Sequence, residues 1–311
     1  MTKKIRVGVA GVGYLGRFHA LIYSRMPDVE LVAVADTDLE TAEKVAGECG
    51  CEAVTDSRDL LGRVDAVSIV VPTTAHLAVA SPFLEQGVHM LLEKPIAASA
   101  EEGREIVRLA DEAGVVLQIG HLERFNAGVM ALADRISNPR FIEAHRMGGF
   151  VARATDVDVV SDLMIHDIDI ILSLVNSEIT SIAAVGTPVL TSHVDIANAR
   201  LEFANGAVAN VIASRVSEKK MRRIRVFEEN CYQSLDFIDQ RIETAYPKPN
   251  PDAEWPEIVL EKQDVEPVKP LDTELAAFIN CIRTGESPLV DGRVGLEALE
   301  VALQVREKIG L

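Results

Sequence analysis

The first third of the chain alternates continuous apolar runs with amphipathic segments. Short apolar runs predict strands buried on both faces of a sheet, and they cover residues 5–10, 30–35, 64–71, 88–92 and 115–119. Between them, apolar residues recur every three or four positions, which predicts helices over 14–26, 39–49, 75–86 and 100–113. Because strands alternate with helices, the pattern predicts an α/β fold with a doubly wound parallel sheet of the Rossmann type.

The pattern changes after about residue 120. Helical spacing predicts helices over 121–136, 161–175, 272–284 and 293–308, and strand patterns cover 141–151, 182–185, 195–203, 207–215, 224–227 and 231–238. Asn205-Gly206 predicts a hairpin turn between two of these strands. The proline-rich segment 246–270 is interpreted as an irregular excursion.

We therefore predict two domains. Residues 1–121 form a dinucleotide-binding Rossmann domain. Residues 122–311 form an α+β domain with a large, mainly antiparallel open sheet. The C-terminal helix is a candidate to pack back on the first domain. A length of 311 residues is consistent with two domains.

The first predicted strand leads directly into a glycine-rich turn with the sequence GVGYLG. Gly11 permits a tight turn, Gly13 lets the backbone approach a pyrophosphate, and Gly16 lets helix and strand pack closely. The N-terminal N–H groups of the following helix point at the phosphates. Asp36 ends the next strand-like run, where a carboxylate that binds the adenosine ribose is expected. This combination predicts a dinucleotide site.

Composition and charge exclude several classes of partner. The net charge of −17 argues against nucleic acid or an anionic membrane surface. One local basic run, from Lys219 to Arg225, stands out against this background. No apolar segment is long enough to span a bilayer and the N-terminus lacks the layout of a signal peptide, so a cytoplasmic protein is expected. Four scattered cysteines do not make a disulfide framework.

Two loops that follow strand-like runs carry polar residues. In open parallel sheets, ligands bind outside the carboxyl ends of the strands. Lys94, in the motif EKP, follows the run 88–92 and is a candidate to hydrogen-bond a substrate hydroxyl near the nicotinamide. The alternative is a surface lysine at a strand end. Pro72, Thr73 and His76 follow another run and are candidates to contact the cofactor, although His76 also fits a plain surface residue.

Asp162, His166 and Asp169 stand at i, i+4 and i+7 of a predicted helix, so they share one face. Burying carboxylates beside an imidazole on an apolar helix costs free energy, so such a group of residues is expected to have a function. An aspartate can fix the tautomer of a histidine and raise its basicity, so His166 with Asp162 is a candidate general base. A metal site is one alternative, but the segment has no second nearby histidine or cysteine to act as a ligand. The other alternative is a purely structural network of hydrogen bonds.

The segment GHLERFN at 120–126 follows the last strand-like run of the first domain. Arg124 and Asn126 are candidates to meet polar groups of a substrate. An ordinary capped helix start is the alternative.

Four motifs together resemble the Gfo/Idh/MocA family of NAD(P)-dependent sugar and cyclitol dehydrogenases. They are GVGYLG at 11–16, VPTTAH at 71–76, EKP at 93–95 and DLMIHDID at 162–169, and the resemblance covers essentially the whole chain. The lysine of the family matches Lys94, and its acid–histidine pair matches Asp162 and His166. Met164 departs from the glycine that many members carry, which narrows the pocket or marks a subgroup.

The resemblance implies hydride transfer from a sugar carbon to nicotinamide. The reacting hydroxyl would lie between Lys94 and His166, and its proton would pass to His166 directly or through Lys94, with Asp162 orienting the imidazole. Asp36 would favour NAD over NADP, because it accepts both ribose hydroxyls and repels a 2′-phosphate. No metal is expected. The implied cofactor contacts are Gly11, Gly13, Tyr14, Leu15, Gly16, Asp36, Pro72, Thr73, His76, Glu93 and Lys94. The implied substrate contacts are Lys94, Arg124, Asn126, Asp162 and His166.

Further stretches resemble the branch that oxidises the 3-hydroxyl of UDP-N-acetylglucosamine: GHLERFN, SDLMIHDIDIIL and ASRVSEKKMRRIRVF. In that branch the 3-keto product passes to a PLP-dependent aminotransferase, giving a 3-amino sugar for lipid A. Ala127 departs from the proline that many members carry. The basic run is a candidate contact for the pyrophosphate of a nucleotide-sugar, and the family implies a homodimer or homotetramer.

Three alternative functions are consistent with parts of the pattern. One is a dehydrogenase of a free sugar or inositol in the same family. Another is a catalytically silent, NAD-binding redox regulator. The joint presence of Lys94, Asp162 and His166 argues against it, because a redox sensor needs only the cofactor-binding residues. The third is a metal-dependent lyase or hydrolase that uses the His166 cluster.

Overall fold

The computed structural model describes residues 3–151, 157–252 and 254–311, and the chain divides into two compact units. The first unit comprises Met1–Leu122 and Lys269–Leu299, and the second comprises Glu123–Val268 and Glu300–Leu311. The predicted second domain, 122–311, therefore differs from the structure over residues 269–299, which belong to the first unit.

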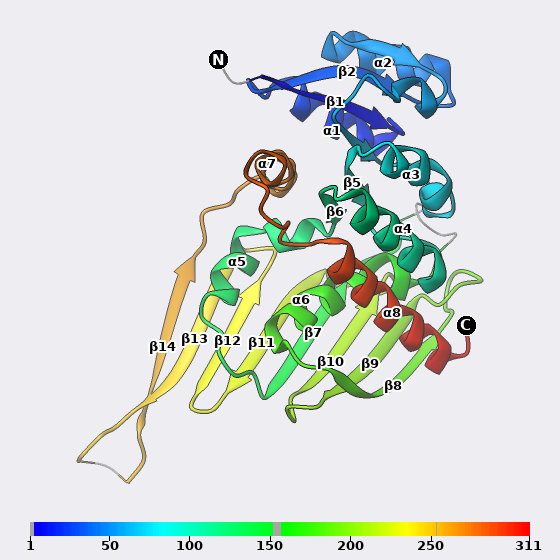
Figure 1. Cartoon of the computed structure of the whole chain (residues 1–311). Coiled ribbons are helices and arrows are strands. Elements are labelled where there is room, and N and C mark those ends of the chain that lie inside the picture. The colour runs from blue at the N-terminus through cyan, green and yellow to red at the C-terminus, as the bar shows by residue number, and fades with distance from the viewer. Residues whose placement is uncertain (1–2, 152–156, 253) are drawn as a thin grey trace. The chain divides into compact units, whose positions relative to one another are not determined.

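The first unit is built on a six-stranded sheet whose paired strands are all parallel, as predicted. The strand order is β3-β2-β1-β4-β5-β6, with the order reversing beside β1 (Figure 1). The strands are β1 (Ile5–Ala10), β2 (Val29–Ala35), β3 (Glu52–Val54), β4 (Ala66–Ile69), β5 (His89–Glu93) and β6 (Leu117–Gly120). The short edge strand β3 was not predicted, because three residues carry too little pattern.

Helices and short turns connect these strands. They are α1 (Tyr14–Tyr23), α2 (Leu39–Cys49), the 3₁₀ turns η1 (Ser57–Leu60) and η2 (Thr73–Ala75), α3 (His76–Glu85) and α4 (Ala100–Ala113). The predicted bounds of α2 and α4 are confirmed. The N-cap of α4 is Ser99, whose side chain accepts a hydrogen bond from the Glu102 N–H, and Gly114 ends the helix in the left-handed region.

Helix α7 (Pro270–Thr284) explains why a C-terminal segment belongs to the first unit. Its residues Leu275, Phe278 and Ile279 are buried in one core with Val7 and Val9 of β1. Helix α8 (Gly292–Ile309) follows, and its early residues also pack on this sheet, since a Cβ at Gly295 would lie 2.5 Å from Ile119. Contacts of this kind join distant parts of the chain and leave no local signal in the sequence.

The second unit is built on an eight-stranded sheet in the order β14-β13-β12-β11-β7-β10-β9-β8. Only β7 and β10 pair in parallel among the described strands of this sheet, so it is mainly antiparallel, as predicted. The strands are β7 (Phe141–Met147), β8 (Ile179–Thr187), β9 (Ile196–Phe203), β10 (Val208–Ser214), β11 (Met221–Glu228), β12 (Cys231–Asp236), β13 (Arg241–Lys248) and β14 (Glu257–Asp264). The predicted hairpin at Asn205-Gly206 is confirmed between β9 and β10, with Gly206 at φ +82.

The interpretation of 246–270 as an irregular excursion is wrong. This segment contains the end of β13 and all of β14, which form a long antiparallel hairpin at the edge of the sheet (Figure 1). The prolines are tolerated because Pro247 lies near the end of β13, Pro256 precedes β14, and an edge strand needs hydrogen bonds on one side only.

Four helical segments complete the second unit: η3 (Leu122–Phe125), α5 (Ala127–Ala133), η4 (Val160–Met164) and α6 (Ile165–Val175). The single helix predicted over 121–136 is split, because Asn126 adopts an extended conformation between η3 and α5. Helices α5 and α6 cover one face of the eight-stranded sheet (Figure 1). In the described part of the chain, no helix is both long and apolar enough to cross a membrane.

Candidate active site

The three glycines of the first turn occupy three different environments. Gly11 has φ +83, and a Cβ there would lie 2.4 Å from the Val70 carbonyl oxygen. A Cβ at Gly16 would lie 1.9 Å from the carbonyl oxygen of Gly11, so only glycine lets α1 approach the turn. A Cβ at Gly13 would meet nothing within 4 Å, which leaves the backbone open to a ligand. These environments fit a bound pyrophosphate.

A pocket of about 320 Å³ opens beside this turn at the carboxyl ends of the strands. Four predicted cofactor residues line it: Gly11, Gly13, Asp36 and Pro72. Sequence reasoning missed three polar residues of the lining, Thr37, Thr55 and Ser57. Thr55 and Ser57 follow β3, which was not predicted, so there was no predicted strand end at which to expect them. Thr37 directly follows Asp36, and its position at that strand end was the signal that could have identified it.

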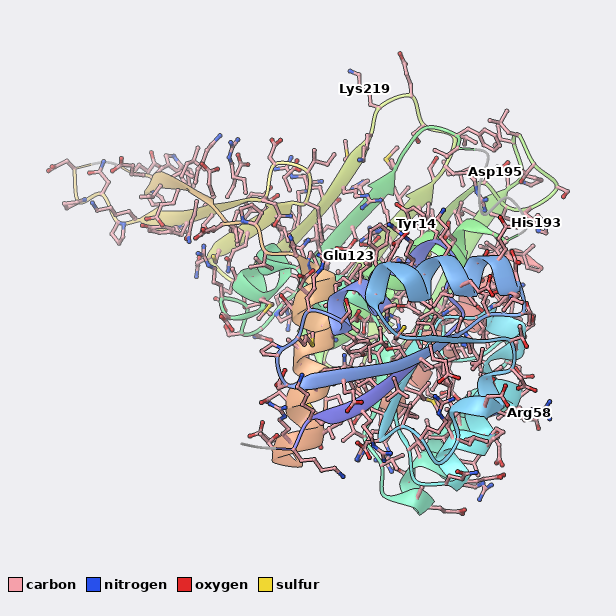
Figure 2. The ribbon with its side chains drawn as sticks, turned by 90° about the horizontal axis from the view of Figure 1, so that it is seen from above. Tyr14, Arg58, Glu123, His193, Asp195 and Lys219 are labelled. Carbon is pink, nitrogen blue, oxygen red and sulfur yellow. The ribbon has the colours of Figure 1, made fainter. Side chains whose placement is uncertain are left out.

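Asp36 is fixed by the main chain on both sides of the pocket. One carboxylate oxygen accepts from the N–H of Val12 at 2.9 Å, and the other accepts from the N–H of Asp38 at 3.0 Å. Arg58 is the nearby basic side chain of η1, and it lies at the surface of its unit (Figure 2). Its guanidinium pairs with Asp56 at 2.5 Å, so an acid already neutralises it.

Other predicted cofactor residues lie outside the pocket lining. Tyr14 is exposed and meets Phe18 edge to face, while Leu15 and Thr73 are half-buried. His76 is buried rather than at the surface. Its ring nitrogens lie 3.2 Å from the Ile96 carbonyl oxygen and 3.0 Å from that of Val71, and burial lowers its pKa.

His76 therefore connects two strand-end loops instead of facing open solvent. One loop carries Pro72 and the other follows Lys94. Lys94 is half-buried directly after β5, and its peptide bond to Pro95 is cis. The structure thus places the predicted lysine at the carboxyl end of a central strand, where ligands of such sheets bind.

The helix that carries the acid–histidine pair lies in the second unit and begins with a π-helical turn, η4. Asp158 caps this turn, since one of its oxygens accepts from the N–H groups of Val160 and Ser161. Arg306 of α8 lies 3.1 Å from Asp158. Asp162 is half-buried within the turn, and His166 is half-buried in the first turn of α6. Single π-helical turns are frequent at functional sites.

Two further acids of this helix anchor it to the rest of the second unit. Asp167 forms two hydrogen bonds of 2.9 Å with Arg146 of β7, and both side chains are buried. Arg146 also reaches Glu123 at 2.7 Å. Asp169 is buried and paired with Arg124 at 3.3 Å.

The two residues predicted from the segment 120–126 have structural partners. Arg124 is engaged with Asp169, as described. The side-chain oxygen of Asn126 accepts from the Gly128 N–H at 2.9 Å and caps α5. The alternative of a capped helix start accounts for this bond, and contact of either residue with substrate stays a prediction.

A second pocket, of about 540 Å³, lies within the second unit and includes Asp162 in its lining. Among the described residues, four cationic side chains also line it: Arg146, Arg215, Lys220 and Arg222. Arg146 and Arg215 are buried and lie beside the acids Asp167 and Asp195. Lys220 is exposed. The side chain of Arg222 is 41% exposed, and its guanidinium lies 3.9 Å from Glu123.

The basic run predicted as one feature is divided by the alternation of β11. Arg222 pairs in register with Arg146 and faces the pocket. Arg223 and Arg225 point to the opposite face, where they pair with Glu243 and Glu143. Among the described residues, no group of three or more histidine, cysteine, aspartate or glutamate side chains is arranged to hold a metal ion.

A parallel sheet with a glycine-rich turn, an acid after the second strand and a strand-end lysine is typical of a dinucleotide-binding oxidoreductase. Comparison with known families narrows this class. Residues 5–121 match "Oxidoreductase family, NAD-binding Rossmann fold", and residues 128–231 match "GFO/IDH/MocA C-terminal domain". The chain belongs to the Gfo/Idh/MocA family of oxidoreductases, as its motifs indicate.

Individual relatives match over different shares of the chain. The chain is 39% identical over 303 residues to UDP-N-acetylglucosamine 3-dehydrogenase of Acidithiobacillus ferrooxidans, which covers 97% of this chain and 96% of that protein. A solved structure of UDP-N-acetylglucosamine 3-dehydrogenase from that organism has a TM-score of 0.91 and 38% identity over 98% of both chains. Scyllo-inositol 2-dehydrogenase (NAD(+)) of Bacillus subtilis (strain 168) is 32% identical, covering 70% of this chain and 69% of that protein.

Proposed function

We propose that the protein oxidises the 3-hydroxyl of UDP-N-acetylglucosamine to a ketone, with NAD as hydride acceptor. The observation that carries this proposal is the cationic pocket around Asp162, combined with a match along nearly the whole chain to a dehydrogenase of that nucleotide-sugar. An inositol carries no phosphate for such a pocket. The inositol dehydrogenase of Bacillus subtilis also matches a smaller share of the chain, 70%.

The chemistry is divided among three side chains. When bound, NAD supplies the acceptor for the hydride that leaves the sugar carbon. Lys94 donates a hydrogen bond to the reacting hydroxyl and stabilises the developing carbonyl. His166 takes the hydroxyl proton, directly or through Lys94, and Asp162 orients the imidazole. The glycine environments of the turn support binding of the cofactor, because Gly13 leaves room for its pyrophosphate.

NAD is the proposed cofactor in preference to NADP. Asp36 lines the pocket and places a carboxylate where the adenosine ribose is expected. A 2′-phosphate would meet that negative charge. Arg58, the cation closest in sequence to the lining residue Ser57, is paired with Asp56 and is therefore not available to compensate.

The diphosphate of the nucleotide-sugar is assigned to Lys220 and Arg222. Both line the pocket that holds Asp162, and both keep substantial exposure. The glycines Gly148 and Gly149 add open backbone to this lining, since no atom lies closer than 3.8 Å to a Cβ built there. Cations beside open backbone suit an anionic, extended ligand such as a diphosphate.

The product and the second sheet suggest two partners. A 3-keto sugar is the carbonyl compound that a PLP-dependent aminotransferase converts to an amine, so we infer that such an enzyme consumes it. We also infer a homodimer or homotetramer that forms through the sheet face opposite α5 and α6, where Arg223 and Arg225 lie. Light scattering of the purified protein tests this, and a monomeric mass would refute it.

The reaction is tested by NADH absorbance with purified protein, NAD and UDP-N-acetylglucosamine. Glutamate and a 3-keto-sugar aminotransferase are added to draw the equilibrium forward. We expect NADH with the UDP-sugar and none with free N-acetylglucosamine, glucose or inositol. A signal with a free sugar or inositol alone would refute the substrate assignment. Cofactor binding without turnover of any sugar would favour the redox regulator instead.

Two variants test the diphosphate site. Lys220→Ala and Arg222→Ala should each raise KM for the UDP-sugar by roughly tenfold, because each removes a charge-assisted hydrogen bond, while kcat changes little. Lys219→Ala is the matched control, since Lys219 lies at the tip of the loop between β10 and β11 and points away from the sheet (Figure 2). If Lys220→Ala and Arg222→Ala both keep the native KM, as Lys219→Ala should, the diphosphate binds elsewhere.

A further inference from the structure

A chain of buried polar side chains runs through the first unit. The Tyr23 hydroxyl lies 2.9 Å from Ser68 Oγ, which lies 3.3 Å from Nδ1 of His19. Nε2 of His19 lies 3.2 Å from Oε1 of Glu93, the residue before Lys94. Tyr23, Ser68 and His19 are fully buried, and Glu93 is 9% exposed. Tyr23, Ser68 and His19 have no role in the proposed hydride transfer.

A charge on Glu93 favours one order of protons along this chain. Nε2 of His19 lies 3.2 Å from Oε1 of Glu93, a close polar contact that lacks the geometry of a hydrogen bond. The negative charge of an ionised carboxylate there favours the tautomer of His19 with its proton on Nε2. Nδ1 of that neutral His19 accepts from the Ser68 hydroxyl, and Ser68 accepts from Tyr23. Neutralising Glu93 removes the charge that favours this order.

The Glu93 carboxylate is held from two further sides. Its Oε2 accepts from the main-chain N–H of Lys94 at 3.3 Å. Gly120 of β6 pairs with Glu93 in the sheet, and a Cβ at Gly120 would lie 2.9 Å from the carboxyl carbon and from both oxygens. The carboxylate thus rests directly on Gly120, and any side chain there would displace it.

Glu274 of α7 adds a second carboxyl group to this cluster. Its side chain is fully buried, and no donor among the described residues hydrogen-bonds either carboxyl oxygen. Burial, and then the charge of Glu93, raise the pKa of Glu274 well above its usual value. Two carboxylates in one buried cluster are not both ionised. The described polar groups near the pair include His19 and Tyr23 of α1, His76 of α3, on which the charge of Glu93 acts, and Gln118 of β6, which donates to the main-chain oxygen of Glu274.

We propose that Glu93, ordered by His19 and seated on Gly120, is a positioning residue for Lys94, and that Glu274 stays neutral so that Glu93 is the one anion of the cluster. The inference rests on the proposed function in that Lys94 acts on the substrate hydroxyl. Because Glu93 holds the main chain of Lys94, the cluster affects turnover more than cofactor binding.

Two variants disturb the carboxylate in different ways. Glu93→Gln removes the charge and keeps the shape, whereas Gly120→Ala keeps the charge and displaces the group. We expect each to lower kcat by about tenfold or more, and to change KM and the Kd for NAD by less than about threefold. The matched control is Gly47→Ala, because a Cβ at Gly47 meets nothing within 4 Å. It should retain native kcat and Kd.

A third variant tests the neutral state of Glu274 without any sugar. A buried carboxyl with a raised pKa stabilises the native state at low pH, and this stability is lost as pH rises from the unfolded-state pKa through the folded-state pKa. The unfolding temperature of the native protein should therefore fall as pH rises above the ordinary pKa of a glutamate and through the raised pKa of Glu274, and Glu274→Gln should flatten that fall. Gly47→Ala should follow the native protein.

Each outcome decides a separate part of the proposal. Native turnover in folded Glu93→Gln and Gly120→Ala, as checked by circular dichroism, would show that Glu93 does not position Lys94. A native pH profile of unfolding in Glu274→Gln would show that Glu274 is not the protonated member. The unfolding measurements need no substrate, so they remain informative if UDP-N-acetylglucosamine is not turned over, and the kinetic tests then use whichever sugar is.

Discussion

At the scale of single residues, Asp36 is the side chain on which we propose that cofactor choice depends. It lines the dinucleotide pocket, and its two oxygens are already oriented by the N–H groups of Val12 and Asp38. A carboxylate fixed in this way is preorganised to accept ribose hydroxyls and to repel a phosphate. Neighbouring Asp38 has a different task, because it caps α2 through the N–H of Glu40.

Replacing Asp36 should therefore change cofactor preference without unfolding the turn. In Asp36→Asn the amide oxygen can keep one of the two main-chain hydrogen bonds, the amide nitrogen cannot accept the other, and the charge is gone. We expect kcat/KM with NAD to fall by roughly tenfold or more, and kcat/KM with NADP to rise. Asp38→Asn serves as the control and should keep the native ratio. An unaltered ratio of the two kcat/KM values in Asp36→Asn would show that another group selects the cofactor.

At the scale of elements, the helix formed by η4 and α6 is held in place by charged contacts rather than by its apolar face alone. Asp158 caps its first turn, Asp167 pairs with Arg146, and Asp169 pairs with Arg124. These contacts fix the orientation of the half-buried Asp162 and His166 on the same helix. Removing Asp167 leaves the buried Arg146 with only part of its compensating charge, from Glu123 at 2.7 Å.

The Arg146–Asp167 pair should accordingly dominate the stability of the second unit. We expect Asp167→Asn to lower the free energy of unfolding by about 3–5 kcal/mol, as measured by chemical denaturation. The control is Glu202→Gln, which removes the partner of Arg200 in a pair whose side chains are each 46% exposed. That change should remain within about 0.5 kcal/mol. If the free energy of unfolding falls by similar amounts in the two variants, burial of the Arg146–Asp167 pair does not make stability depend more strongly on Asp167.

At the scale of the whole molecule, the residues proposed for the chemistry are divided between the two units. The first holds the dinucleotide pocket and Lys94, and the second holds Asp162 and His166 together with the cationic pocket. Helix α8 has residues in both units. Turnover should therefore require both units, whereas cofactor binding should require only the first.

This division predicts how catalytic variants behave. Lys94→Ala and His166→Ala should each lower kcat by about 100-fold or more, since each removes a group that acts on the hydroxyl proton. The Kd for NAD, measured by fluorescence titration, should stay close to native in His166→Ala. His193→Ala is the control in the second unit, because His193 lies on the loop before β9 and outside the pocket lining (Figure 2). Native turnover in either Lys94→Ala or His166→Ala removes that residue from the mechanism.

The sequence by itself determined the features that local physics controls. The period of apolar residues predicted most strands and helices, because burial on one or two faces imposes it. Gly11, Gly13, Gly16 and Asp36 predicted the dinucleotide site, because the turn requires those residue types at that spacing. The motif containing Lys94 indicated a strand-end lysine for the same kind of reason.

Only the tertiary structure decided the features that depend on contacts between distant segments. It placed α7 in the core of the first unit and put Glu274 near Glu93, which are 181 positions apart in the sequence (274 − 93). It paired Asp169 with Arg124 in an ion pair, and it placed the arginines of the basic run on two opposite faces of β11. A side chain's partners follow from packing, and the local pattern of polar and apolar residues specifies only which face the side chain takes.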